Sequence, residues 1–193
     1  MKNSFLETIK CVDGKIFNLG YHQERYETVL NSLGIKDIKK LENYIEAPKI
    51  GVFRCRLVYS LDEMNVSYHE YKKREISSLK IIFDNEIDYS MKFTHRDEID
   101  KLYAQRADCD DILIIKNLLV TDTSIANIAF YKDNRWITPK KPLLEGTTRA
   151  RLLNEGKLIK ADIKVQELRS FSKVALLNAM IDFDILDTCT FLI

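Results

Sequence analysis

The chain has 193 residues, a formal net charge of +1, 46% hydrophobic residues and 31% charged residues. This length can bury a core in one domain or two small ones, and the near-zero net charge gives no general attraction to nucleic acid or to acidic membranes. No run of about 18 apolar residues occurs, so we expect no membrane-spanning helix. The start lacks the apolar core of a signal peptide, and the four cysteines form no Cys-x-x-Cys pair. We therefore expect a cytoplasmic protein with reduced thiols, without a metal site.

The first part of the chain predicts a small α+β unit. Residues 5–10 and 15–19 are typical of two short strands joined by a turn. Apolar residues recur at helical spacing in 22–33, which predicts a helix, and a similar pattern predicts a second helix over 38–47.

Residues 52–60 alternate between apolar and polar side chains, which predicts a half-buried strand with a partner near 65–72. Arg54 and Arg56 share the polar face of this strand. Two basic residues in this position most often point into solvent. The functional alternative is that they bind a carboxylate group of a substrate.

The charged run at 71–75 is the best linker candidate, so we predict two domains, residues 1–74 and 75–193. The second domain is predicted to mix strands and helices without regular βαβ alternation, which favours the α+β class. Its expected strands are 79–83, 111–115, 118–121, 127–131, 135–138, 158–165 and 174–178, and its expected helices follow residue 94 and span about 147–155 and 166–171. Thr94 is expected to cap the first of these helices.

Two neighbouring segments of the second domain predict a ligand site. Asp122 begins a hydroxyl-rich turn before a predicted strand, and Gly146-Thr147-Thr148-Arg149 opens a predicted helix. The backbone N–H groups at a helix start, together with threonine hydroxyls, bind anions. An anion site beside a carboxylate suits a phosphorylated, cationic heteroaromatic cofactor.

Several segments, in this order, carry a resemblance to a known family. They are Ser4-Phe5-Leu6-Glu7-Thr8-Ile9-Lys10, Gly14-Lys15-Ile16-Phe17, His22-Gln23-Glu24-Arg25, Leu33-Gly34-Ile35, Lys92-Phe93-Thr94-His95-Arg96 and Asp110-Asp111-Ile112-Leu113. With the segments described above, they resemble the class IV (fold type IV) pyridoxal-phosphate enzymes, which include branched-chain aminotransferases, D-amino-acid aminotransferases and aminodeoxychorismate lyases. The resemblance implies two small α/β domains with the site for pyridoxal 5′-phosphate between them, and a homodimer.

The resemblance also implies roles for two ionisable residues. Lys92 would be the catalytic lysine that binds the cofactor as a Schiff base, and its apolar neighbours would lower its pKa by desolvation. Read without the resemblance, Lys92 is an ordinary surface lysine. Asp122 stands where the family has a glutamate that pairs with the pyridine nitrogen, and its side chain is shorter by roughly 1.5 Å. The alternative is that Asp122 caps its own turn.

Further cofactor contacts are expected around the phosphate. The resemblance assigns Arg25, Thr147 and Thr148 to the phosphate, and the turn at Ser124 and Ile125 could add contacts. The structural alternatives are an N-cap role for Thr147 and a solvated Arg25.

Asn178 bears on the reaction, because Leu177-Asn178-Ala179 resembles the strand end of the lyase branch. With Arg54 and Arg56, it completes the predicted substrate-binding set. The leading hypothesis is a lyase of folate biosynthesis that acts on a small amino substrate, releasing pyruvate from 4-amino-4-deoxychorismate to give 4-aminobenzoate. The alternatives are a class IV aminotransferase for branched-chain or D-amino acids, and a degenerate member that binds without catalysis. The last is suggested by Asp122 and by a chain shorter than is usual for the family.

Overall fold

A computed structural model describes residues 4–193, and in it the chain divides into two compact units. Unit 1 holds the residues up to Lys73 together with the short segment Met91–His95, and unit 2 holds Arg74–Ser90 and Arg96–Ile193. Each unit builds its own hydrophobic core. The segment Met91–His95 is therefore a short return of the chain to unit 1 between two parts of unit 2.

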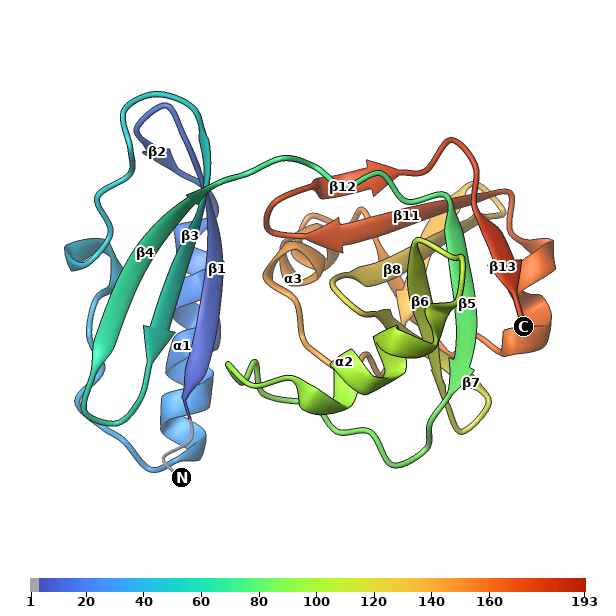
Figure 1. The fold of residues 1–193 in the computed structure, drawn as a ribbon, viewed down its shortest axis with the longest axis horizontal. Helices are drawn as coiled ribbons and strands as arrows, with labels where there is room; N and C mark the ends of the chain where they lie inside the picture. Colours follow the sequence, from blue (N-terminus) through green and yellow to red (C-terminus); the bar gives the residue numbers. More distant parts are fainter. Residues whose placement is uncertain (1–3) are drawn as a thin grey trace. The chain divides into compact units, whose positions relative to one another are not determined.

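Unit 1 is an antiparallel sheet with a helix packed on one face (Figure 1). The sheet has the order β2 (Lys15–Ile16), β1 (Phe5–Val12), β3 (Val52–Tyr59) and β4 (Met64–Glu70). Helix α1 (Leu19–Ser32) buries Tyr26, Val29 and Leu30 against the apolar face of these strands. The predicted first helix and the predicted strand pair are confirmed, because alternation and helical spacing both match one buried face.

The second helix predicted for 38–47 is wrong. This segment contains a single 3-10 turn, η1 (Leu41–Asn43), and its other residues are irregular. Leu41 and Ile45 still pack into the core of unit 1, and the N–H of Leu41 donates to Oε1 of Gln23 at 2.8 Å. Apolar spacing therefore predicted the burial of Leu41 and Ile45, although Tyr44 of the same pattern is exposed, and contacts with α1 set the backbone conformation.

Unit 2 is built around a mixed sheet (Figure 1). Its strands are β5 (Ser78–Phe83), β6 (Asp111–Lys116), β7 (Leu119–Thr123), β8 (Asn127–Lys132), β9 (Arg135–Pro139), β10 (Ile159–Ala161), β11 (Lys173–Asn178), β12 (Asp182–Ile185) and β13 (Thr190–Leu192). The main path runs β10-β9-β8-β7-β6-β5-β13, and β11 pairs with both β8 and β12. The expected α+β class is confirmed, because the parallel pairs are few and no regular βαβ repeat forms.

The helical elements of unit 2 are short. They are α2 (Asp97–Tyr103), η2 (Ala104–Arg106), α3 (Thr147–Asn154) and η3 (Val165–Ser170). Helix α3 packs Leu152 against Ala129 of β8 and Leu177 of β11. The helix predicted for 166–171 is therefore a 3-10 helix, and the strand predicted for 158–165 shortens to the three residues of β10.

Local turn chemistry behaves as expected at one hairpin. Asp133 and Asn134 join β8 to β9 with φ of 50° and 59°, the left-handed conformation that two-residue hairpin turns require. The cap predicted at Thr94 is wrong, because α2 begins after Arg96 without a side-chain cap. Thr94 belongs to unit 1, where its N–H donates to the carbonyl of Ser4 at 3.0 Å.

Within residues 4–193, no helix is both long enough and apolar enough to cross a membrane.

Candidate functional site

Lys92 lies in a segment that pairs with β1. The carbonyl of Lys92 accepts from the N–H of Leu6 at 2.8 Å, and Phe93 forms a bridge with Phe5. Met91 and Phe93 pack against the core of unit 1, and Lys92 itself is half-buried. The expected apolar neighbours are therefore present, and the backbone of the candidate lysine is fixed by the sheet.

A buried charge cluster lies beside β1 in the same unit. Glu7 is 1% exposed and accepts from Nδ1 of His22 at 2.6 Å and from Nε and Nη2 of Arg25 at 2.8 and 2.5 Å. Burial raises the pKa of Glu7, but the charge of Arg25 and the hydrogen bonds from His22 and Arg25 outweigh it, so the pKa falls to about 2. The carboxylate is therefore charged at neutral pH, and it orients the guanidinium of Arg25.

His22 is the third member of this cluster. Burial lowers its pKa, hydrogen bonding and the charge of Glu7 oppose this, and the charges of Arg25 and Lys92 lower it further. A neutral imidazole is the result, with Nδ1–H donating to Glu7. The influence of Lys92 on His22 shows that the candidate lysine, His22 and Arg25 share one electrostatic neighbourhood within unit 1.

Arg54 and Arg56 lie on the sheet face opposite to the core of unit 1. Register places Lys10, Arg54 and His69 side by side on β1, β3 and β4, with Arg56 in the next row between Thr8 and Ser67. In the described part of the chain none of these basic side chains forms an ion pair, and Lys10 instead lies 6.0 Å from the ring centre of Phe17. Like charges placed opposite each other repel, so this face is suited to an anion.

In unit 2, Asp122 is buried at the end of β7 with both carboxylate oxygens bonded. Oδ1 accepts from Nδ2 of Asn127 at 2.7 Å, and Oδ2 accepts from the N–H of Leu144 at 2.9 Å. Burial raises the pKa of Asp122 to about 6, because these hydrogen bonds and the charge of Arg149 offset desolvation only in part. This carboxyl therefore titrates well above the ordinary range of an aspartate and is still mostly ionised at neutral pH.

The turn between β7 and β8 is tied down from three directions. The carbonyl of Ser124 accepts from Nη2 of Arg96 at 3.0 Å, and the Ser124 side chain hydrogen-bonds to Asp111. The carbonyl of Ile125 accepts from Nδ2 of Asn178 at 3.3 Å. Oδ1 of Asn178 also accepts from two backbone N–H groups of the turn that follows β11. Asn178 therefore positions both the Ser124-Ile125 turn and the turn that follows β11.

The first turn of α3 presents a set of donors. Gly146 is its N-cap and, within residues 4–193, no side chain caps the helix. Thr147 and Thr148 are buried on the first turn, and no hydrogen bond of their hydroxyls occurs in the same part of the chain. Arg149 is fully buried, donating to the carbonyl of Pro139 at 2.7 Å and to Glu145, while its Nε has no partner among the described residues. Backbone N–H groups and two hydroxyls form a donor set that fits a phosphate group.

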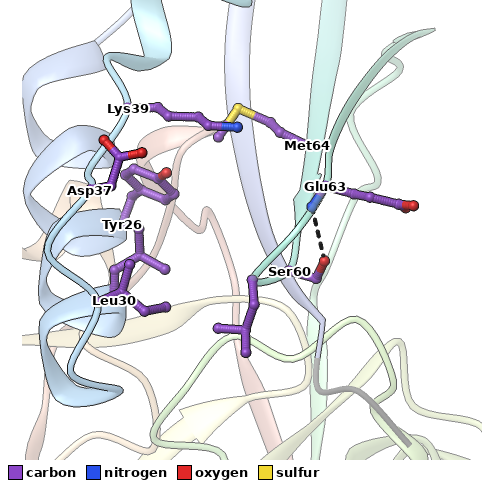
Figure 2. Close-up of a pocket in the computed structure, with 9 residues that line it drawn as sticks. Tyr26, Leu30, Asp37, Lys39, Ser60, Glu63 and Met64 are labelled. Atoms are coloured by element: carbon purple, nitrogen blue, oxygen red, sulfur yellow. Dashed lines mark hydrogen bonds between the residues drawn. The ribbon is translucent and has the colours of Figure 1, made fainter.

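A small hollow in unit 1 lies elsewhere. Figure 2 shows Tyr26 and Leu30 of α1 on one side and Ser60, Glu63 and Met64 on the other. It offers about 30 Å³, which is room for little more than a water molecule. None of the predicted site residues lines this hollow, so it does not compete as the site.

The comparisons with known proteins decide the family. The protein-family model described as "Amino-transferase class IV" matches residues 4–183. The chain belongs to this family. Enzymes of the class IV family use pyridoxal 5′-phosphate, and the chain is an enzyme of that family with the fold of fold type IV enzymes.

Three relatives show how far the likeness extends. A crystal structure from Haemophilus somnus, named a putative 4-amino-4-deoxychorismate lyase, has a TM-score of 0.87 and 36% identity, covering 93% of this chain and 97% of that chain. An uncharacterized protein of Haemophilus influenzae is also 36% identical, over 90% of this chain and 96% of its own. A putative aminodeoxychorismate lyase of Schizosaccharomyces pombe is 25% identical over 93% of this chain and 87% of its own. The short length noted above is thus shared with the Haemophilus relatives.

The structure places the predicted site residues in two groups. Lys92, Arg25, Arg54 and Arg56 lie in unit 1; the others, Asp122, Ser124, Ile125, Thr147, Thr148 and Asn178, lie in unit 2.

Sequence reasoning gave no role to Glu7 and His22, although the i, i+3 spacing of His22 and Arg25 puts both on one helix face. The sequence suggested that Asn127 holds the turn after Asp122, and Nδ2 of Asn127 does donate to Oδ1 of Asp122. Its second hydrogen bond, to the carbonyl of Leu144, was not predicted, because no local pattern signals a partner 17 residues away.

Proposed function

We propose that this class IV enzyme is a pyridoxal-phosphate-dependent lyase that releases pyruvate from 4-amino-4-deoxychorismate and leaves 4-aminobenzoate. One observation carries the proposal: the 36% identity, over nearly the full length of both chains, to the Haemophilus somnus protein named for this reaction. The 25% identical relative from Schizosaccharomyces pombe carries a corresponding name. The family model also supports an aminotransferase, which would share the cofactor and Lys92 but transfer the amino group to a keto acid.

The residues of unit 2 fit the cofactor. The start of α3 supplies N–H groups and the Thr147 and Thr148 hydroxyls for the phosphate, and Asp122 supplies a carboxylate for the ring nitrogen. The Asp122 carboxylate accepts hydrogen bonds from Asn127, from the N–H of Leu144 and from the backbone of Leu143, which leaves part of its acceptor capacity for a ligand. The Ser124-Ile125 turn, held by Arg96 and Asn178, would border the ring. Once bound, the cofactor supplies an electron sink for a carbanion at the substrate carbon that bears nitrogen.

Lys92 and the buried cluster supply the groups of unit 1. Lys92 would hold the cofactor through Nζ, and its amine would take the proton from the substrate carbon that bears the nitrogen. Loss of this proton would let the C–O bond to the enolpyruvyl group break with its electron pair on oxygen. The departing enolate would take up a proton to become pyruvate, and the ring would become aromatic. We propose that Arg25, oriented by Glu7, adds a bidentate contact to the phosphate.

The basic face of unit 1 supports a substrate with carboxylate groups. Arg54 and Arg56 lie on neighbouring rows of β3, beside Lys10 and His69, and no acidic residue lies on this face of β1, β3 and β4. 4-Amino-4-deoxychorismate carries two carboxylates, so we propose Arg54 and Arg56 as their binding residues, with Asn178 contributing at the end of β11. Like other class IV enzymes, the protein would act as a homodimer, which light scattering of the purified protein tests.

Product analysis tests the reaction. Purified protein that is supplied with pyridoxal 5′-phosphate and 4-amino-4-deoxychorismate should form pyruvate and 4-aminobenzoate in equal amounts. It should do so without a keto acid as amino acceptor. Borohydride reduction followed by peptide mass spectrometry should place the cofactor on Lys92. Lys92→Ala should abolish both results, while Lys101→Ala, an exposed lysine on α2, should change neither. Stoichiometric amino transfer to a keto acid would decide for the aminotransferase, and a protein that takes up no cofactor would overturn both functions.

A further inference from the structure

Asn127 connects two segments of unit 2 that are far apart in the sequence. It is the first residue of β8 and is 5% exposed. Its Nδ2 donates to Oδ1 of Asp122 at 2.7 Å and to the carbonyl of Leu144 at 2.8 Å, and Oδ2 of Asp122 accepts from the N–H of Leu144 at 2.9 Å. These hydrogen bonds close a ring that holds both polar backbone atoms of Leu144.

The other end of the Asn127 amide lies against Gly146. A Cβ atom on Gly146 would lie 2.0 Å from Oδ1 of Asn127, far inside van der Waals contact. Gly146 has φ −73° and ψ 142°, which any residue adopts, so glycine is needed here for space and not for backbone freedom. The amide of Asn127 therefore sets how closely the chain approaches β8 just before α3.

Gly146 is the N-cap residue of α3. Its carbonyl accepts the first hydrogen bond of the helix, from the N–H of Ala150 at 2.9 Å. The positions of Leu144 and Gly146 therefore determine where the N–H groups and hydroxyls of the first turn lie. A displacement of about 1 Å at such a start is enough to weaken binding of a phosphate, since directional donors must converge on it.

We propose that Asn127 is a positioning residue for phosphate binding: through Leu144 and Gly146 it fixes the start of α3, although it makes no contact with the ligand itself. This inference rests on the proposed function for the identity of the ligand. It extends that function by coupling the carboxylate assigned to the cofactor ring with the helix assigned to the phosphate.

The discriminating measurement compares two ligands that differ by the phosphate. Apo-protein is titrated with pyridoxal 5′-phosphate and with pyridoxal. Asn127→Ala should weaken binding of the phosphorylated ligand by roughly tenfold or more, the effect of about one lost hydrogen bond in a buried network, and should affect pyridoxal much less. Equal losses for the two ligands, or no loss, would overturn the proposal.

Thr138→Val is the matched control. Thr138 is fully buried on β9, and its hydroxyl donates to the carbonyl of Ile128, the neighbour of Asn127, at 2.8 Å. The variant removes a buried hydrogen bond of the same sheet without touching Leu144 or Gly146. It should lower stability and leave the ratio of the two affinities unchanged; a ratio that shifts as in Asn127→Ala would show that any loss of stability has this effect.

Gly146→Ala approaches the same contact from the other side. Alone it should weaken binding of pyridoxal 5′-phosphate, because the new methyl group forces Oδ1 of Asn127 and the start of α3 apart. In the Asn127→Ala background the added methyl group meets no amide, so its further effect should be smaller than in the wild type. Strictly additive losses would contradict a shared contact.

Two readouts remain independent of the cofactor. Amide hydrogen exchange at Leu144 should accelerate in Asn127→Ala and stay unchanged in Thr138→Val. If the wild-type protein bound neither pyridoxal compound, the proposed function would be wrong. The positioning role of Asn127 would then be tested by the stabilisation of the apo-protein by inorganic phosphate. Loss of that stabilisation in Asn127→Ala alone would support it. Equal stabilisation in both variants, or none in the wild type, would overturn it.

Discussion

Two of the buried carboxylates, one in each unit, behave in opposite ways. Glu7 in unit 1 and Asp122 in unit 2 are 1% and 5% exposed. Burial raises the pKa of both, yet Glu7 falls to about 2 while Asp122 rises to about 6. The donors to Glu7 include the guanidinium of Arg25, whereas the donors to Asp122 are a neutral amide and backbone N–H groups. Between Glu7 and Asp122, the charge of the donor and not the degree of burial sets the direction of the pKa shift. Asp111 shows that a charged partner does not always prevail, because burial raises its pKa although the partly exposed Arg74 pairs with it.

Glu7→Gln is expected to have the largest effect. The variant removes the buried carboxylate that pairs with the guanidinium of Arg25, which is 13% exposed, and this should reduce the free energy of unfolding by about 3–5 kcal/mol. Urea denaturation, monitored by amide hydrogen exchange in α1, measures this change in the free energy of unfolding. Asp100→Asn, which removes the exposed partner of Arg96, should cost about 0–0.5 kcal/mol. Similar losses in both variants would remove the distinction between buried and exposed pairs.

The pH dependence of stability should differ in sign between the two carboxylates. Asp122 has a folded pKa of about 6 against an ordinary 3.8, so between these values the native state holds a proton that the unfolded state has released. Its contribution is therefore lost as pH rises from about 4 to 6, by on the order of 3 kcal/mol. Glu7 has a folded pKa of about 2 against 4.5, so its contribution is lost as pH falls through that range.

The single tryptophan, Trp136, lies in unit 2 and reports its unfolding by fluorescence. The difference in stability between the wild type and Asp122→Asn should become less favourable to the wild type between pH 4 and 6. A difference that stays flat over this range would mean that Asp122 titrates with an ordinary pKa.

His22→Gln should have a smaller effect than removal of Glu7 itself. It removes the hydrogen bond from Nδ1 and leaves the charge of Arg25 in place, so a loss of about 1 kcal/mol is expected. The pKa of Glu7 should rise, since this hydrogen bond lowers it. A carboxyl titration of Glu7 by NMR measures the change, and an unchanged pKa would show that Arg25 alone sets the charge of Glu7.

Arg54→Ala and Arg56→Ala should have the smallest effect on stability, within about 0.5 kcal/mol, because neither arginine has an ion-pair partner among the described residues. In the lyase assay each variant should raise KM by about tenfold, because a substrate carboxylate loses its contact with an arginine, and kcat should change less. Lys15→Ala, on the edge strand β2, is the control and should leave KM unchanged. An unaltered KM in both arginine variants would remove them from the substrate site.

Much of the candidate site was accessible from the sequence as separate residues. The order of short motifs pointed to Lys92 and Asp122, and the run of glycine, threonines and arginine marked the start of α3. What could not be predicted is which of these side chains form hydrogen bonds with other parts of the protein. Asp122 is bonded to Leu144, 22 residues away, and Arg25 to Glu7, 18 residues away. Local pattern carries no information about such pairs.

The sequence by itself determined the elements whose cause is local: the alternation of β1 and β3, the apolar stripe of α1, and the left-handed turn at Asp133 and Asn134. The tertiary structure alone decided that 38–47 is not helical, and that Thr94 meets Ser4 and not the start of α2. The physical reason is the same in each case. Periodicity and turn chemistry act over a few residues, whereas the protonation of a buried carboxylate and the start of a binding helix depend on donors that folding brings from distant parts of the chain.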